Sequence, residues 1–298
     1  MNPKILVTGA SGAFGQRVIH HLLHSLAIEP SRVVAASRQP GALKDLAARG
    51  VRTVTADFEQ PTTMATAFAG IDRLLLVSTD AIDRPGARLK QHLAAVAAAE
   101  AAGVGHVVYT SMPNPKASAV LFAPDHASTE AALAASRLPA WTVLRNHWYF
   151  ENLFMTLPGV LAAGGQWFSA AGEGRLANVS RDDLARAAAT VLAGTGAGKT
   201  VHTLSGEEAF TTAEQARAIA QALGRPITVV PVPIEGLVEG MVRAGLPEPF
   251  ARVMASFDTN TAAGHVGRPT SDYRRITGQE PERLADWLAR HAGKLAGR

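Results

Sequence analysis

Short apolar runs alternate with stretches of helical periodicity through the first half of the chain. Six of these runs are apolar without strict alternation, which is typical of parallel strands that are covered on both faces. The six are Lys4–Thr8, Arg32–Ala36, Val51–Ala56, Asp72–Ser78, His106–Ser111 and Trp141–Arg145. The stretches between them predict helices near Phe14–Leu26, Gly41–Arg49, Pro61–Ala69, Pro85–Ala102 and Pro124–Ser136. This alternation, with right-handed crossovers, predicts an α/β fold with a doubly wound parallel sheet of Rossmann type.

The second half of the chain is less regular. Ser180 followed by Asp182 and Asp183 predicts a capped helix that runs to about residue 193. The other expected elements are strands near Thr200–Leu204 and Ile227–Val232, helices over Thr211–Leu223 and Pro281–Ala296, and two or three helices within Ile234–Ala263. No internal repeat or low-complexity linker interrupts the sequence. We therefore expect a Rossmann domain over residues 1–150, with contributions from about 177–205, and a smaller, interleaved C-terminal α/β lobe over residues 151–298.

A glycine-rich loop follows the first predicted strand and opens the first predicted helix. It reads Thr-Gly-Ala-Ser-Gly-Ala-Phe-Gly from Thr8 to Gly15, a spacing that resembles the short-chain dehydrogenase/reductase superfamily. Such glycines allow a tight turn, the approach of backbone amides to a pyrophosphate, and close packing of helix on strand. The alternative is a flexible turn, but strand, loop and helix follow in the order that a dinucleotide site requires. The residues expected to hold the phosphates are Gly9, Ser11, Gly12, Ala13, Phe14 and Gly15.

The end of the second predicted strand decides which dinucleotide fits. An NAD site places an acid there for the ribose hydroxyls, whereas this chain has Arg38 and no acid within residues 35–40. A guanidinium suits the 2′-phosphate of NADPH, and Lys44 is a more weakly placed helper. The alternative for Arg38 is a solvated surface arginine. The expected cofactor is therefore NADPH, and the Rossmann domain is expected to be its binding domain.

Two further strand ends supply expected cofactor contacts. Asp57 and Phe58 follow the third strand, where a carboxylate edges the adenine and an apolar ring covers it, although Asp57 could instead cap the next helix. Val77, Ser78 and Thr79 end the fourth strand and should run beside the nicotinamide ribose.

The chain lacks the Tyr-x-x-x-Lys pair with which carbonyl-reducing short-chain dehydrogenases donate a proton. None of its three tyrosines, Tyr109, Tyr149 and Tyr273, is followed by lysine four residues later. Where the pair would lie, His126 and Glu130 share one helical face. His126 could donate a proton, cap the helix or pair with Glu130, and Tyr149 is a second candidate donor. A quinone or a cationic conjugated dye needs no strong acid, because its reduction yields a phenolate or a neutral product.

Composition excludes several classes of protein. The 298-residue chain has no cysteine, which excludes disulfides and thiolate sites and favours a cytoplasmic location. The apolar run at residues 5–7 is too short for a signal peptide, and no run is long enough to span a membrane. The net charge is +4, and the basic residues are scattered and interleaved with acids rather than gathered in one patch, so no nucleic acid is expected as a partner. No metal site is expected either, since His20, His21 and His24 lack converging carboxylates.

Together these motifs resemble the NmrA-like atypical short-chain dehydrogenases, including members that reduce quinones and triphenylmethane dyes. The matching segments are Thr8–Gly15, Arg38, Asp57–Phe58, Tyr109–Ser111, His126–Glu130, Leu144–Asn152 and Gly245–Phe250. The resemblance implies that a set of residues near the fifth and sixth strands approaches the nicotinamide end of the cofactor: Ser111, Leu144, Arg145, Asn146 and His147. It also implies a pocket for the acceptor, with core packing between the lobes as the alternative. The implied pocket residues are Met112, Trp148, Tyr149 and Phe150.

Three functions remain open from the sequence. The first is NADPH-dependent hydride transfer to a quinone or a similar conjugated, electron-poor acceptor, with a triphenylmethane-type dye as a further substrate. The second is reduction of another activated C=N, C=C or C=O compound, with His126 or Tyr149 as the proton donor. The third is NADP(H) sensing without turnover, in a regulatory binding protein. The aromatic residues after the sixth strand favour an acceptor pocket, and the expected partner is a small aromatic or quinonoid molecule bound by a monomer or homodimer.

Overall fold

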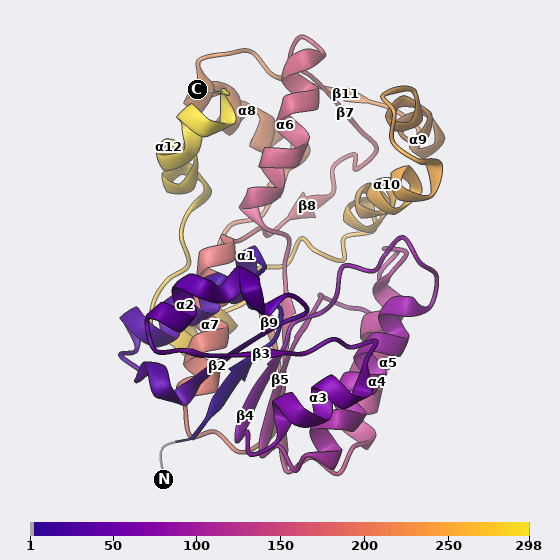
Figure 1. Ribbon diagram of the computed structural model, residues 1–298. Helices are drawn as coiled ribbons and strands as arrows, with labels where there is room; N and C mark the ends of the chain where they lie inside the picture. The colour runs from indigo at the N-terminus through magenta and orange to yellow at the C-terminus, as the bar shows by residue number, and fades with distance from the viewer. Residues whose placement is uncertain (1–2, 298) are drawn as a thin grey trace.

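A seven-stranded parallel sheet forms the centre of the computed structural model, which describes residues 3–297 (Figure 1). The strand order is β3-β2-β1-β4-β5-β6-β9, and every neighbouring pair is parallel. The strands are β1 (Ile5–Val7), β2 (Val33–Ser37), β3 (Arg52–Thr55), β4 (Arg73–Leu76), β5 (His106–Ser111), β6 (Ala140–Asn146) and β9 (Lys199–Leu204). The central strands β1 and β4 are buried along their whole length. The predicted doubly wound α/β fold is confirmed.

Helices cover both faces of this sheet, which is why its inner strands β1, β2 and β4 are buried, whereas the edge strands β3 and β9 are partly exposed. One face carries α1 (Ala13–His20), α7 (Arg181–Ala193) and α11 (Asp272–Thr277), and their side chains share a core with β1 and β2. The other face carries α3 (Pro61–Phe68), α4 (Ala87–Ala101) and α5 (Ala123–Ala135). The short helix α2 (Lys44–Ala48) precedes β3. A π-helical turn at His21–Ser25 extends α1, and 3₁₀ turns lie at Pro30–Arg32, Pro40–Leu43 and Phe150–Asn152.

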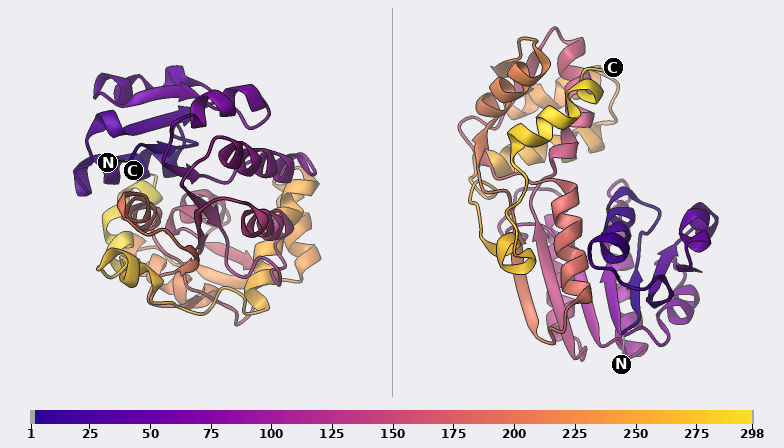
Figure 2. Two further views of the ribbon diagram at one scale, coloured as in Figure 1. Left: turned by 90° about the horizontal axis from the view of Figure 1, so that it is seen from below. Right: turned by 90° about the vertical axis from the view of Figure 1, so that its left-hand side faces the viewer.

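A smaller lobe sits above the carboxyl ends of the strands (Figures 1 and 2). Its helices are α6 (Leu153–Ala162), α8 (Thr212–Leu223), α9 (Ile234–Arg243), α10 (Glu248–Ala262) and α12 (Leu284–Leu295). Two small sheets complete it: β7 (Gln166–Ser169) with β11 (Thr228–Pro231), and β8 (Arg175–Leu176) with β10 (Phe210–Thr211). Between these segments the chain returns to the main sheet for α7 and β9. The domain boundaries inferred from the sequence remain predictions.

Each strand and helix expected from the sequence pattern is present, with ends that shift by a few residues. Helix α6 was not predicted. It contains Pro158 and is apolar on most sides, so it has no amphipathic period to reveal it. The helix α11 and the strands β7, β8 and β10 were also missed, because each has six residues or fewer and therefore shows too little periodicity.

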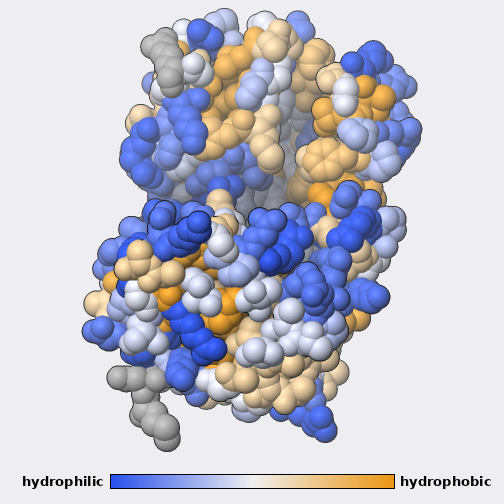
Figure 3. Space-filling view, viewed as in Figure 1, coloured by the Kyte–Doolittle hydropathy of each residue, from blue (hydrophilic) through white to orange (hydrophobic). Residues whose placement is uncertain are grey.

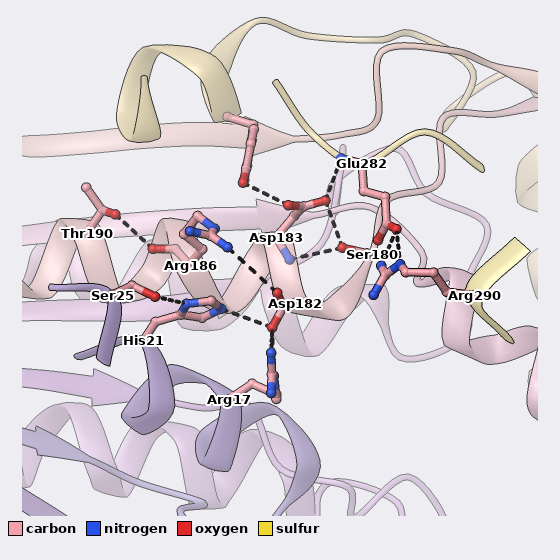
Figure 4. Close-up of polar contacts among 11 residues, drawn as sticks. Arg17, His21, Ser25, Ser180, Asp182, Asp183, Arg186, Thr190, Glu282 and Arg290 are labelled. Carbon is pink, nitrogen blue, oxygen red and sulfur yellow. Dashed lines mark hydrogen bonds and ion pairs between the residues drawn. The ribbon is translucent and has the colours of Figure 1, made fainter. Parts of the chain in front are cut away.

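The first turn of α7 carries two adjacent acids that bind different parts of the chain (Figure 4). Ser180 caps the helix by accepting from the Asp183 amide at 3.0 Å, as predicted. The buried Asp183 carboxylate accepts from the Tyr273 hydroxyl at 2.8 Å, the Ser180 hydroxyl at 2.7 Å and the Glu282 amide at 2.8 Å. It therefore ties two points of the C-terminal segment to α7.

Asp182, on the same turn, holds helix α1 instead. It accepts from Arg17 Nε at 2.6 Å and bonds His21 Nε2 at 3.0 Å (Figure 4). Burial opposes ionisation of Asp182, but hydrogen bonds from His21 and Arg17 outweigh it and hold the pKa of this carboxyl well below its usual range. The two acids thus connect the glycine-loop helix, α7 and the C-terminal segment.

We expect Asp183→Ala to lower the free energy of unfolding by about 3 kcal/mol, because it leaves the buried Tyr273 hydroxyl and the Glu282 amide without an acceptor. Asp286→Ala is the control: this exposed acid in the first turn of α12 has no hydrogen bond or ion pair among the described residues, so its loss should cost about 1 kcal/mol or less. Urea unfolding measures both values. Equal losses for the two variants would contradict the role assigned to Asp183.

Candidate functional site

The chain reverses its winding direction between β1 and β4, which are neighbours at the middle of the sheet. In doubly wound sheets, ligands bind at this switch point, outside the carboxyl ends of the strands. The structure brings to this edge the loops that follow β1, β2, β3, β4, β5 and β6. All the cofactor contacts expected from the sequence lie on or next to these loops.

The glycine loop turns sharply out of β1 and lies directly against α1. Gly9 adopts a left-handed conformation with φ of +59°, which a residue with a side chain rarely adopts. A Cβ atom on Gly15 would lie 2.4 Å from the Gly9 carbonyl oxygen, whereas one on Gly12 would lie 3.3 Å from it. Gly15 is therefore required for close packing of helix on strand, and Gly9 for the turn.

The start of α1 presents unpaired backbone donors. Gly12 is the N-cap residue and offers no side chain to cap the helix. Within residues 3–297, no backbone or side-chain atom accepts from the amides of Ala13 and Phe14. Ser11, Gly12 and Ala13 are also exposed. Free amides at the positive end of a helix form an anion site, so the residues present fit a pyrophosphate.

Arg38 lies beside this cradle and is largely free. Its guanidinium is 65% exposed, and its nearest acid is the exposed Asp80 at 3.9 Å. The neighbouring Ser37 hydroxyl bonds the Ser11 hydroxyl at 2.9 Å, which links the end of β2 to the glycine loop. The guanidinium can thus turn toward a phosphate without breaking a short ion pair.

Asp57 uses its carboxylate locally. It accepts from the Glu59 amide at 3.0 Å and from Gln60 Nε2 at 2.9 Å, which closes a local turn before α3. It does not cap that helix, whose N-cap residue is Gln60 and has no side-chain cap. Phe58 next to it is partly buried and packs on the core below α3. An adenine contact through Asp57 remains a prediction, and it would use lone pairs that the turn leaves free.

The end of β6 concentrates buried polar groups that have no partner within residues 3–297. They are Asn146 Oδ1 and Nδ2, His147 Nδ1 and Trp148 Nε1, from three consecutive residues. Burial lowers the pKa of His147 to about 4, so its ring is neutral at physiological pH. Unpaired buried polar groups are rare in folded proteins. Their clustering here is typical of a site that a bound polar group completes, and it fits the expected nicotinamide end.

His126 is placed inside a buried network rather than at the open edge of the site. Its Nε2 accepts from Arg88 Nη2 at 2.8 Å, and its Nδ1 bonds the Tyr109 hydroxyl at 2.8 Å. Burial and the nearby Arg88 lower the pKa of His126 well below its usual value. The neutral ring therefore has both nitrogens engaged, which does not favour a role as proton donor.

Glu130 does not pair with His126. It accepts from the Ser111 hydroxyl at 2.6 Å and from Arg145 Nε and Nη2 at 3.0 and 2.6 Å. The helical face that carries a tyrosine and a lysine in carbonyl-reducing relatives here carries two side chains with internal partners. The sequence pattern indicates both residues but not these partners, because the partners come from α4, β5 and β6.

Of the four residues expected to line the acceptor pocket, the structure brings two together. Met112 and Trp148 share a small apolar cluster with Phe122 and with Phe257 of α10. The Trp148 and Phe257 rings are edge to face, with centroids 4.8 Å apart. Phe257 was not identified from the sequence, since only the fold brings α10 over the end of β6.

Tyr149 and Phe150 do not join this cluster. Phe150 packs in the core of the lobe, 5.7 Å from the Trp287 ring, which is the core-packing alternative. Tyr149 forms a β-bridge with Val179, and the Arg181 guanidinium lies 5.1 Å from its ring. Burial raises the pKa of the Tyr149 hydroxyl, so it is a poor acid at neutral pH.

The molecule is hollowed between its two halves on the face drawn in Figure 3, with apolar side chains above the hollow and mainly polar ones below it.

Across residues 3–297, no three His, Cys, Asp or Glu side chains gather as metal ligands would. Over the same range, no helix is both long and apolar enough to cross a membrane.

Comparisons with known proteins agree with this geometry. The model of the NmrA-like family matches residues 1–274. Quinone oxidoreductase 2 of Escherichia coli K12 is 32% identical over 95% of this chain and 96% of its own. The triphenylmethane reductase of Citrobacter sp., solved with NADP(H), superposes with a TM-score of 0.87 at 32% identity, covering 97% of this chain and 99% of that one. The NADPH-dependent E. coli quinone oxidoreductase solved with NADPH gives 0.90 at 31% identity, covering 96% and 99%.

We expect Gly15→Ala to destabilise the protein by about 2 kcal/mol or more, because its Cβ would overlap the Gly9 backbone, which cannot move aside freely. Gly41→Ala is the control, since a Cβ there meets nothing within 4 Å. Thermal or urea unfolding measures the difference. A Gly15→Ala variant as stable as the Gly41→Ala variant would show that the close approach is not required.

Proposed function

The chain belongs to the NmrA-like family, and from this premise we propose that it reduces quinones or similarly conjugated, electron-poor acceptors by direct hydride transfer from NADPH. It is an NAD(P)H-dependent oxidoreductase of the atypical short-chain dehydrogenase/reductase type, with NADPH as cofactor. The observation that carries the choice of acceptor is the α5 face, where His126 and Glu130 are both engaged by internal partners.

The chain's own residues would hold the cofactor at three points. The free amides of Ala13 and Phe14 bind the pyrophosphate. The exposed Arg38 guanidinium binds the 2′-phosphate. The unpaired groups of Asn146 and His147 face the nicotinamide end. NADPH supplies a hydride when bound, and the protein supplies binding and orientation.

The lack of a free acid at the site fits a quinone. Addition of a hydride to a quinone gives a hydroquinone anion, whose conjugate acid has a pKa of about 10, like tyrosine. The anion takes one proton from water, so the products are the hydroquinone and NADP⁺. A simple ketone would instead develop an alkoxide, a strong base that needs a positioned donor. The buried His126 and Tyr149 do not provide one.

The cluster of Met112, Phe122, Trp148 and Phe257 supports a flat, apolar acceptor. Two of its rings pack edge to face, the kind of contact that an aromatic acceptor makes with aromatic side chains. A triphenylmethane-type dye would use the same surface, and its reduction neutralises the cation without any proton.

We expect the purified protein to oxidise NADPH with a benzoquinone or naphthoquinone, and more slowly with a cationic dye, but not with a simple ketone. Burial lowers the pKa of His126 and His147 and raises that of Tyr149, so none of the three donates a proton near neutrality, and kcat/KM for the quinone should be nearly constant from about pH 6 to 8. Loss of NADPH absorbance measures both. Rapid ketone reduction, or an activity limb near the usual histidine pKa that disappears in His126→Gln, would contradict the proposal. Tight NADPH binding without turnover of any acceptor would support an NADP(H) sensor instead.

Arg38→Ala should weaken NADPH binding by about 10- to 100-fold and change NADH binding by about twofold or less, because only NADPH carries the 2′-phosphate. Arg137→Ala is the control: it also removes a highly exposed arginine, but one paired with Glu100 away from the site. Fluorescence titration of both nucleotides gives the dissociation constants. Equal losses for NADPH and NADH would overturn the role of Arg38.

A further inference from the structure

The backbone of Val77–Thr79, the segment that follows β4, is held by side chains from three different elements. Strand pairing of β4 ends at Leu76, so these residues have no neighbouring strand to receive their amides. Each amide instead donates to a side chain: Val77 to Thr8 Oγ1 at 2.9 Å, Ser78 to Thr110 Oγ1 at 2.9 Å and Thr79 to His92 Nε2 at 3.0 Å. The segment therefore has no free amide, and it can meet a ligand only through its side chains and carbonyls.

The backbone of Thr79 is hydrogen-bonded at both its amide and its carbonyl group. His92 accepts from its amide, and Arg88 Nε donates to its carbonyl oxygen at 2.8 Å. Arg88 and His92 are four residues apart on α4 and so share one helical face. Both side chains are buried, so neither bond competes with water.

Hydrogen bonding also fixes the proton on each histidine. His92 Nε2 accepts from Thr79, so Nδ1 carries the proton and donates to Thr129 Oγ1 at 3.1 Å. His126 Nε2 accepts from Arg88, so its Nδ1 donates to the Tyr109 hydroxyl at 2.8 Å. His126 thus orients Arg88, and Thr129 on α5 orients His92.

The charges around this cluster keep both histidines neutral. Arg88 faces Asp125 at 3.7 Å and lies 5.0 Å from the Phe122 ring centroid. Burial and then Arg88 lower the pKa of His92 to about 3. Because the pKa of His92 in the folded protein lies below its usual value, the ring becomes protonated only as the pH falls toward about 3. A proton on His92 Nε2 would then face the N–H of Thr79, and the hydrogen bond between them would be lost.

We propose that Arg88 and His92 are positioning residues that fix the Thr79 peptide and so align the edge of the nicotinamide site. His126 and Tyr109 support them from α5 and β5. The proposal rests on the proposed function, because it assigns the Val77–Thr79 segment to the nicotinamide end of NADPH. Val77 already borders the glycine loop, since a Cβ on Gly9 would lie 3.5 Å from its side chain.

A second buried histidine offers a matched control. His106 starts β5 at the opposite, amino edge of the sheet. Its Nδ1 accepts from Arg73 Nη2 at 2.5 Å, and its Nε2 bonds Thr142 Oγ1 at 2.9 Å. It therefore matches His92 in burial and in having two polar partners, one of them a threonine hydroxyl, but it touches no loop of the cofactor site.

The test compares His92→Leu, His92→Gln and His106→Leu with the parent protein. In the protein without cofactor, amide hydrogen exchange at Thr79 should become at least about tenfold faster in His92→Leu only. The affinity for NADPH and the single-turnover rate of hydride transfer to a quinone should each fall about tenfold in that variant. Affinity for adenosine 2′,5′-bisphosphate, which lacks the nicotinamide half, should stay unchanged. His92→Gln should restore most of the loss, because its amide oxygen can accept from Thr79.

Unchanged Thr79 exchange in His92→Leu would overturn the proposal. So would faster exchange with unaltered NADPH affinity and turnover, or losses in His106→Leu as large as those in His92→Leu, since these would indicate a stability effect alone. If the parent protein bound no NADPH, the proposed function would fail, and with it the assignment of this segment to a nicotinamide site. The exchange data would still show separately whether His92 holds the peptide.

Discussion

The functional edge of the protein depends on one close contact, between the first turn of α1 and the backbone that leaves β1. Gly15 has no room for a side chain against the Gly9 carbonyl, so helix and strand meet backbone to backbone. As at the start of any α-helix, the first amides have no carbonyl within the helix to bond, and within residues 3–297 no atom accepts from those of Ala13 and Phe14. An anion site at such a helix start needs no charged side chain within the loop.

The remaining loops are arranged around this cradle by the order of the strands. Because β4 lies next to β1, the segment after β4 borders the glycine loop, and it continues toward β5 and β6. Side chains rather than strand pairing fix its backbone. The same sheet places the unpaired polar groups of Asn146 and His147 at the neighbouring edge. The groups gathered at this end of the site are thus backbone and neutral side chains, which suits an acceptor that needs no strong acid.

The fold could be predicted from the sequence because parallel strands that are buried on both faces appear as short apolar runs. The start of α7 could be predicted because its cap, Ser180, is a local feature of the sequence. The glycine loop could also be located from the sequence, because the residues that form it are consecutive. The partners of His126 could not be predicted, because Arg88 and Tyr109 are 38 and 17 residues away along the chain and meet it only through helix packing. Phe150 was assigned to the pocket by resemblance, yet it begins a 3₁₀ turn and packs into the core of the lobe. Phe257 was missed because only the folding of the chain brings α10 next to the end of β6.

A crystal structure of the protein with NADPH would show where the dinucleotide binds. We expect pyrophosphate oxygens within hydrogen-bonding distance of the Ala13 and Phe14 amides, with the nicotinamide ring between the segment that follows β4 and the end of β6. A dinucleotide bound elsewhere on the protein, or with its phosphates away from the start of α1, would contradict this expectation.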